Sequence, residues 1–289
     1  MSTAVTLRNG VETNNAMAKR RKLEDTFSNK SKKPVEKGHK ANGERDSIKD
    51  KCGLKKNQFG DLSNGFMSNG DWRKRWDKGQ TKFHKPTYND ILLSYYDAMV
   101  NGKTKCRVFV PLCGKSVDMK WLLDKGHSVV GCELVELGVQ QFFREQDIEY
   151  IVETIPSLTN GKLYKGVKHD IRIYTCDFFE LNSTTTEGKF DCVWDRGSLA
   201  AINPSDRSRY HDVILDLLDE NGRYLLDVFE VDHTNFAGPP NSFVKEDLHN
   251  LFAERCNVED LKTRDAMNPW AKSWGVEYFI ECVYMISFK

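Results

Sequence analysis

The stretch VFVPLCGKS, residues 108–116, decides the fold of this chain. It begins with an apolar run typical of a buried strand, and Gly114 then predicts a tight turn. Residues 117–123 continue at once with apolar side chains at helical spacing: Met119, Leu122 and Leu123. A strand, a glycine turn and a helix in direct succession form the nucleotide crevice of α/β folds. The sequence therefore predicts an α/β protein that binds a nucleotide-type ligand at this turn.

Further apolar runs on both sides of this stretch extend the pattern into a sheet. Because only a short loop separates the last two strands, they must pair antiparallel. We expect an α/β fold with a doubly wound, mostly parallel, seven-stranded sheet and an antiparallel C-terminal strand pair. The expected strands are 106–110, 128–132, 171–176, 190–194, 223–229, 256–263 and 276–288, with two short extended pieces beside Pro156 and Asn160-Gly161; the expected helices are a short one bearing Trp72 and Trp76, then 91–99, 117–124, 135–146, 206–218 and 244–252.

Charge divides the chain near residue 68. Residues 1–68 hold 15 Lys and Arg against 8 Asp and Glu, a net +7, whereas the remainder holds 28 against 34, a net −6. The first part has few large apolar side chains, and none recur at helical or strand spacing, so it buries too little surface to offset its ordering entropy. We expect a disordered basic tail at 1–68 and one α/β domain at 69–289.

Targeting signals are sparse. No apolar run reaches the length of a membrane span, and the first residues lack a secretory signal segment. The eight cysteines form no C-x-x-C pair, which favours reduced thiols over disulfides or a metal site. We therefore expect a cytoplasmic protein without a membrane partner. The cluster Lys19-Arg20-Arg21-Lys22 is either a signal for a nuclear fraction or a solvated basic segment.

The residues after the strands identify the cofactor. Gly114 stands alone rather than in G-x-G-x-x-G, which counts against a dinucleotide pyrophosphate. Glu133 ends the second strand, where an acid accepts hydrogen bonds from ribose hydroxyls. Asp177 and Phe178 end the third strand, an acid and an aromatic suited to an adenine.

One glycine, a ribose acid and an adenine pair fit S-adenosylmethionine, which has no phosphate. The antiparallel C-terminal pair also fits the seven-stranded sheet of the Rossmann-like methyltransferases better than the wholly parallel sheet of a dehydrogenase. We therefore expect residues 69–289 to form an S-adenosylmethionine-dependent methyltransferase domain.

Two groups of side chains remain ambiguous from the residues alone. Trp72 and Trp76, with Phe83 after them, are either core aromatics or a lid over the ligand, because the segment precedes the first strand and has no place in the sheet. Arg196 follows the fourth strand, where doubly wound folds place their chemistry. It is either a catalytic cation or the partner of a structural salt bridge with Asp195 or a neighbouring residue.

The body of the chain, from about Asp71, resembles the thiopurine S-methyltransferases. The resemblance is specific because many motifs occur in one order over three quarters of the sequence; the tail lies outside it. The matching motifs are Trp72-x-x-x-Trp76, Phe83-His84, Pro111-Leu112-Cys113-Gly114-Lys115, Gly126-His127-Ser128-Val129-Val130-Gly131, Glu136-Leu137-Gly138, Trp194-Asp195-Arg196-Gly197, Ala201-Ile202-Asn203-Pro204, Gly238-Pro239-Pro240 and Lys272-Ser273-Trp274-Gly275.

The resemblance implies an S-adenosylmethionine-dependent enzyme that methylates a small thiol or thiopurine. It also implies a role for each matching position. The cofactor set is Trp72, Trp76, Leu112, Gly114, Glu133, Asp177, Phe178 and Arg196, with Arg196 as the catalytic residue. The matching acceptor residues are Phe83, Pro239 and Pro240, and Trp270 stands at a further acceptor position.

One departure concerns the acceptor. The family carries a second arginine four residues before the tryptophan of Lys-Ser-Trp-Gly, and this chain has Trp270 there. A tryptophan makes the pocket more apolar and removes a cation that favours an anionic sulfur. Arg196 then remains as the cation expected to lower the pKa of the acceptor thiol.

Two other functions stay open at this stage. A nucleic-acid methyltransferase is suggested by the basic tail, but the acidic body is a poor phosphate-binding face, and Asp195-Arg196-Gly197 replaces the Asn/Asp-Pro-Pro-aromatic motif of that class. A non-catalytic cofactor-binding module is compatible with Trp270. Cys113 lacks an identifiable base and is expected to pack the turn. The sequence shows no dimer surface, so we expect a monomer.

Overall fold

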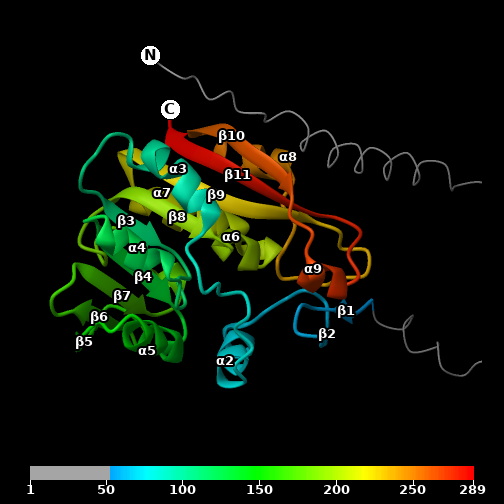
Figure 1. Cartoon of the computed structure of the whole chain (residues 1–289), viewed down its shortest axis with the longest axis horizontal. Helices are drawn as coiled ribbons and strands as arrows, with labels where there is room; N and C mark the ends of the chain where they lie inside the picture. Colours follow the sequence, from blue (N-terminus) through cyan, green and yellow to red (C-terminus); the bar gives the residue numbers. More distant parts are fainter. Residues whose placement is uncertain (1–52) are drawn as a thin grey trace, which may run out of the picture.

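The computed structural model describes residues 53–289 (Figure 1). The basic cluster at residues 19–22 and most of the expected tail lie outside the described residues. No helix in the described part of the chain is long and apolar enough to cross a membrane.

Five parallel strands form the centre of one sheet. Their side chains are nearly all buried, as expected for strands covered by helices on both faces. The strands pair in the order β7-β4-β3-β8-β9, so the chain winds outward in both directions from β3 and confirms the doubly wound prediction. Their bounds are β3 Arg107–Val110, β4 Ser128–Glu133, β7 Ile171–Thr175, β8 Phe190–Arg196 and β9 Leu218–Val231.

Antiparallel strands extend both edges of this sheet. The predicted C-terminal pair is confirmed: β11 (Phe279–Phe288) lies between β9 and β10 (Cys256–Asp265) and is antiparallel to both. At the other edge, β6 (Lys162–Gly166) and β5 (Tyr150–Thr154) add an antiparallel pair beside β7. The described sheet therefore has nine strands, two more than the seven expected, because the short extended pieces join it.

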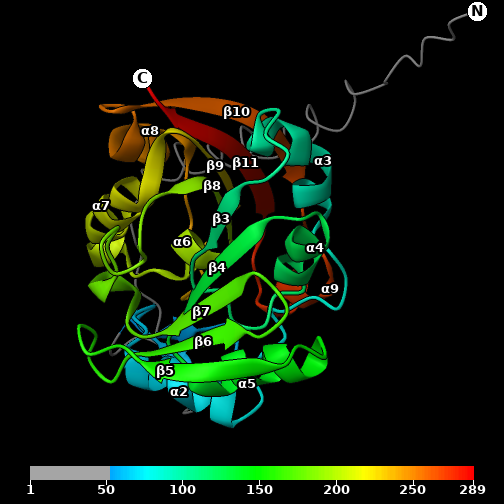
Figure 2. The same ribbon diagram turned by 90° about the vertical axis from the view of Figure 1, so that its left-hand side faces the viewer.

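Helices cover the two faces of the sheet and enclose two cores (Figure 2). One face carries α3 (Asp90–Val100), α4 (Asp118–Asp124) and α5 (Glu136–Glu145). The other carries α7 (Arg207–Leu217) and α8 (Lys245–Phe252). The remaining helices are short: α2 Asn69–Asp77, α6 Ser198–Ala201 and α9 Pro269–Ser273, with 3-10 turns at Phe178–Glu180 and Pro204–Asp206.

A buried aspartate fastens the first crossover helix to the sheet. Asp118, at the start of α4, accepts hydrogen bonds from the backbone N–H of Asn89 at 2.8 Å and from Trp194 Nε1 at 3.0 Å. These bonds join α3, α4 and β8 beneath the carboxyl ends of the strands. A carboxylate with such partners remains stable in a core, because its buried oxygens are satisfied.

Ordered structure begins before the expected boundary at residue 68. A small hairpin, β1 (Lys55–Lys56) and β2 (Leu62–Ser63), packs on the domain, and Met67 is buried. Asn203 holds this segment with two bonds, accepting from the Met67 N–H at 2.9 Å and donating to the Met67 carbonyl at 3.0 Å. The prediction of disorder is therefore wrong for residues 53–68, because backbone bonds to the domain stabilise a segment with little periodicity.

The start of α2 also differs from expectation. The sequence offers Asn69 or Asp71 as the helix cap, but Ser68 is the N-cap. Its hydroxyl accepts from the Asp71 N–H at 3.2 Å, and the Asp71 carboxylate accepts from the Ser68 N–H at 3.1 Å. This reciprocal capping box satisfies two helix N–H groups and leaves the Asn69 side chain available for another contact.

Candidate active site

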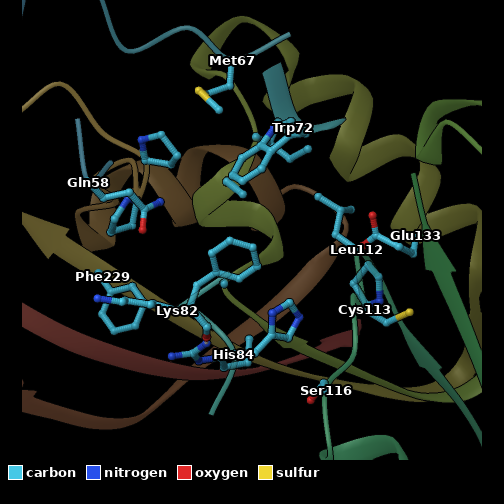
Figure 3. Close-up of a pocket in the computed structure, with 18 of the residues that line it drawn as sticks. Gln58, Met67, Trp72, Lys82, His84, Leu112, Cys113, Ser116, Glu133 and Phe229 are labelled. Atoms are coloured by element: carbon cyan, nitrogen blue, oxygen red, sulfur yellow. The ribbon is translucent and has the colours of Figure 1, made fainter. Parts of the chain in front are cut away.

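One large cavity, of about 910 Å³, opens at the carboxyl ends of the central strands. This is the edge where doubly wound sheets bind their ligands. Figure 3 shows Leu112, Cys113 and Glu133 on one side of the cavity, Phe229 and Lys82 on the opposite side, and His84 between them. The cavity is large enough for a nucleoside-sized cofactor together with a small acceptor.

The cavity brings together eleven of the twelve predicted site residues. Gly114 alone is not part of its lining, because the rings of His84 and Trp76 cover it. The eleven are Trp72, Trp76, Phe83, Leu112, Glu133, Asp177, Phe178, Arg196, Pro239, Pro240 and Trp270.

The turn after β3 has an unusual backbone. Leu112 has φ 43° and Gly114 has φ 51°, both in the left-handed region. Leucine adopts this region rarely, so the conformation of Leu112 costs free energy that the surrounding structure must supply. The N–H of Lys115 donates to His84 Nε2 at 3.0 Å, and burial lowers the pKa of His84 to about 4. The imidazole of His84 is therefore uncharged at neutral pH, and its ring covers the turn at Gly114.

Glu133 lies at the end of β4, as predicted, and its carboxylate binds two backbone N–H groups. Oε2 accepts from Gly114 at 2.9 Å and Oε1 from Val135 at 2.7 Å. The side chain is buried, and burial raises its pKa to about 7 despite these bonds. Each carboxylate oxygen accepts more than one hydrogen bond, so the group has capacity left for two ribose hydroxyls.

Asp177 and Phe178 form the corner that the sequence assigns to an adenine. Asp177 accepts from the N–H of Phe179 at 3.0 Å and from Asn69 Nδ2, at the start of α2, at 2.7 Å. The ring of Phe178 is stacked against Tyr210, with ring centroids 4.7 Å apart, and is almost wholly buried. The packing of Phe178 on an adenine base stays a prediction, because most of the ring contacts other residues of the hydrophobic core.

The aromatic residues between β2 and α3 face the cavity as a group. We call residues 69–84 the lid segment. Phe83 lies edge-on to both Trp72 and Trp76, with centroids 6.2 and 6.3 Å apart, and 4.6 Å from His84. Gly138 of α5 makes room for Trp76, because a Cβ there would lie 2.8 Å from its ring. The tryptophans thus line the ligand cavity as well as packing on the domain.

Arg196 ends β8 at the boundary between the two halves of the cavity. Its Nη1 donates to the Phe83 carbonyl at 2.8 Å, and its buried Nε has no hydrogen-bond partner among the described residues. The alternative of a salt bridge with Asp195 is not formed. Asp195 points to the opposite face and accepts from Tyr210, Tyr224 and the N–H of Ser198. One donor of the guanidinium is therefore not engaged by any described residue.

The far half of the cavity is largely apolar. Phe229 and Phe279 are stacked with centroids 4.7 Å apart, and Trp270 lies edge-on to Trp274 at 4.8 Å. Pro239 and Pro240 line the same half. Trp270 is half-buried and belongs to this apolar cluster, as its position in the sequence suggests. Such a surface fits a flat, weakly polar ring.

Sequence reasoning missed several lining residues. Asn69 contacts Asp177 across 108 positions, and Gln58 and Met67 come from the segment that was expected to be disordered. Arg264 and Glu281 lie on the antiparallel strands and form an ion pair beside the apolar half. The only available signal was charge within otherwise apolar strand patterns, as at Glu281 in β11.

The sequence matches one family of known proteins over most of its length. Residues 67–289 match the family model described as thiopurine S-methyltransferase. The thiopurine S-methyltransferase of Bos taurus is 42% identical over 219 residues, which cover 76% of this chain and 89% of that protein. The enzyme of the same name from Rattus norvegicus is 39% identical over 226 residues, covering 78% and 94%.

A solved structure resembles the fold. The 1,6-didemethyltoxoflavin-N1-methyltransferase of Burkholderia thailandensis, with S-adenosylhomocysteine bound, covers 76% of this chain and 87% of its own with a TM-score of 0.51. At 17% sequence identity this likeness concerns the fold alone.

Proposed function

The chain belongs to the thiopurine S-methyltransferase family, and from that premise we propose which residues hold each ligand and what acceptor the cavity takes. The protein is an S-adenosylmethionine-dependent S-methyltransferase acting on thiopurine-type acceptors. We propose that its acceptors are small aromatic thiols, bound with the ring against the apolar half of the cavity and the sulfur toward Arg196. Neither a nucleic-acid methyltransferase nor a binding module is supported by the relatives found.

Arg196 carries this proposal. Arg196 lines the cavity, and its buried Nε has no hydrogen-bond partner among the described residues. A thiolate is a far better nucleophile than a thiol, and a neighbouring guanidinium lowers the pKa of an acceptor thiol by favouring its charged form. The buried surroundings strengthen this interaction relative to water.

The residues of the other half fit S-adenosylmethionine. Glu133 offers a buried carboxylate for the ribose, Asp177 an acceptor for the adenine amine, and the backbone of Leu112 a contact for the methionine portion. When bound, S-adenosylmethionine supplies a methyl group already activated by a sulfonium. The chain then has to orient the acceptor sulfur and exclude water, which the lid segment and the apolar half are placed to do.

Cofactor affinity should depend on the charge of Glu133. The carboxylate form is the better acceptor for ribose hydroxyls, and burial raises its pKa to about 7. Below that pH the acid is increasingly protonated, so binding should weaken by up to about tenfold per pH unit, and above it binding should level off. Calorimetric titration with S-adenosylhomocysteine from about pH 5.5 to about pH 8.5 measures this. A flat profile would contradict the role, and Glu133→Gln should remove the dependence.

Trp270 should determine affinity for the acceptor ring. We expect Trp270→Ala to raise KM for benzenethiol about tenfold, because part of the aromatic contact surface is lost. The dissociation constant of S-adenosylhomocysteine should stay unchanged. Trp121→Ala is the matched control, since Trp121 packs on Tyr96 and is not part of the cavity lining. An equal rise of KM in both variants would show a general loss of structure instead.

The proposed acceptor class is tested by labelled methyl transfer. The protein is incubated with S-adenosylmethionine carrying a labelled methyl group and, in parallel, with aromatic thiols, aliphatic thiols, thiopurines, RNA and DNA. Transfer to aromatic thiols and thiopurines is the expected result. Cofactor binding without transfer to any acceptor would favour the non-catalytic module.

We also propose a monomer in the cytoplasm, with a nuclear fraction that depends on residues 19–22. The support for a reducing compartment is that the seven cysteines in the described part of the chain are buried free thiols. The support for a monomer is that eleven of the predicted ligand-binding residues line one cavity of a single chain. Light scattering of the eluting protein and imaging of a tagged chain with residues 19–22 neutralised test these points.

A further inference from the structure

Asp227 is a buried carboxyl group that no described residue partners. Its side chain is 0% exposed, and neither oxygen has a hydrogen-bond or ion-pair partner among residues 53–289. Buried polar groups are nearly always satisfied, because leaving one unpaired costs free energy. An unsatisfied acid in the core therefore needs an explanation.

The strand register puts Asp227 beside the acceptor half of the cavity. Alternate residues of a strand share a face, so Asp227 points to the same side as Phe229, which lines the cavity. In the parallel pairing of β8 and β9, Asp227 is the partner of Arg196. In the antiparallel pairing of β9 and β11, Phe229 is the partner of Glu281. Asp227 thus lies one strand spacing from Arg196, beneath the site proposed for the acceptor sulfur.

The cations around Asp227 differ in whether they already have hydrogen-bond or ion-pair partners among the described residues. Arg264, on β10, is paired with Glu281 and with Asp90, the latter through bonds of 2.5 and 3.2 Å. The Nε of Arg196 is unpartnered among the described residues. Arg196 is therefore a neighbouring cation with an uncommitted donor on the strand next to Asp227, whereas Lys85 is an exposed cation from the cavity lining. The charged groups that act on Asp227 are Arg196 from β8, Arg264 from β10, Glu281 from β11 and Lys85 from the segment before α3.

These surroundings favour the protonated, neutral form of Asp227. Burial, and next the charge of Glu281, raise its pKa to about 8, while Arg196, Lys85 and Arg264 partly oppose the shift. The group is then mostly neutral at pH 7 and ionises as the pH rises above about 8.

We infer that Asp227 is a positioning residue whose ionisation sets how much of the charge on Arg196 is available to an acceptor thiolate. This rests on the proposed role of Arg196. While Asp227 is neutral, Arg196 is free to attract the thiolate. Once ionised, Asp227 competes for the guanidinium and repels the sulfur. By linkage, a bound thiolate makes Asp227 hold its proton more tightly.

The test compares the wild type with Asp227→Asn, which mimics the neutral acid. The acceptor is 4-nitrobenzenethiol, which is ionised at neutral pH, so its own titration does not affect the profile. At saturating cofactor, kcat/KM of the wild type should fall about tenfold between about pH 8 and about pH 9.5, following the protonated fraction. The variant should stay within about twofold of its own value at pH 7. Glu230→Gln, on the opposite face of the same strand, is the control and should keep the fall.

Two results would overturn the inference. The first is an unchanged alkaline fall in Asp227→Asn. The second is loss of turnover at every pH in that variant, which would make the carboxylate a proton acceptor. If Arg196→Ala has no effect on turnover, the proposed function fails as well; if Arg196→Ala is impaired but the fall persists in Asp227→Asn, the inference alone fails.

A second measurement uses the unmodified protein and so does not depend on the folding of the variant. When 4-nitrobenzenethiolate binds to protein saturated with S-adenosylhomocysteine at about pH 8.5, the raised affinity of Asp227 for its proton should cause net proton uptake. Calorimetry in two buffers of different ionisation enthalpy measures that uptake. Binding without proton uptake would overturn the inference.

Discussion

Replacing Arg196 by alanine should lower kcat/KM for an aromatic thiol about 100-fold, while the dissociation constant of S-adenosylhomocysteine changes less than about threefold. The guanidinium ends β8 between the two halves of the cavity, with its Nε uncommitted among the described residues. Its removal leaves the acceptor sulfur without the cation proposed to favour the thiolate. Steady-state kinetics with benzenethiol and calorimetry with S-adenosylhomocysteine give the two numbers.

Further variants separate charge from packing. Because Arg196 also donates to the Phe83 carbonyl, its loss loosens the lid segment. Arg196→Lys keeps the charge and should recover part of the rate, whereas Arg196→Gln keeps only a donor and should not. Arg172→Ala, on β7 and paired with Glu187, is a control distant from the cavity lining. Equal turnover in Arg196→Ala and wild type would remove Arg196 from the mechanism.

Replacing Gly114 by alanine should weaken S-adenosylhomocysteine binding by more than about 100-fold. A Cβ at this position would lie 2.1 Å from His84 Nε2 and 3.3 Å from the Trp76 ring. The lid segment and the turn cannot then keep their present contact. The φ of 51° adds strain for any residue with a side chain. The bond from the Gly114 N–H to Glu133 is expected to be lost with the turn.

Gly126→Ala is the matched control for this change. Gly126 also has a positive φ, 91°, but no atom lies within 4 Å of its added Cβ. It should lower the melting temperature without altering cofactor affinity. His84→Ala in the Gly114→Ala background should restore part of the binding, since it removes the clashing ring. Unaltered binding in Gly114→Ala alone would show that the turn accepts a side chain.

The sequence predicts the fold well where one pattern decides one element. The β3–α4–β4 unit is found within two residues of its expected bounds, because buried parallel strands read as apolar runs and Gly126 ends the helix. The predictions were wrong where hydrogen bonds between residues far apart in the sequence determine the local structure. Residues 53–68 lack periodicity, but Asn203 fixes them from 136 positions away. Competing caps misled the assignment of α2, in which Ser68 takes the place expected for Asn69 or Asp71.

The residues of the candidate site also fall into those that the sequence could predict and those that it could not. Glu133, Asp177 and Arg196 follow parallel strands, whose carboxyl ends meet at one edge, so their convergence on the cavity could be predicted from chain order. Pro239 and Trp270 were assigned through family resemblance alone. Asp227 and Arg264 escaped notice because the register of β9, β10 and β11 determines their neighbours, and register does not follow from alternation.

The position of β11 has a consequence for synthesis on the ribosome. β10 precedes β11 in the chain, yet it joins the described sheet only through β11, which lies between it and β9 (Figure 1). Domains tend to fold from the N-terminal side as the chain emerges, so β10 leaves the exit tunnel before its neighbour is available. An unpaired strand invites aggregation, and charged side chains counter that tendency. β10 carries Glu259, Asp260, Lys262 and Arg264. We expect these charged side chains to keep the unpaired strand soluble until β11 has been synthesised and can pair with it.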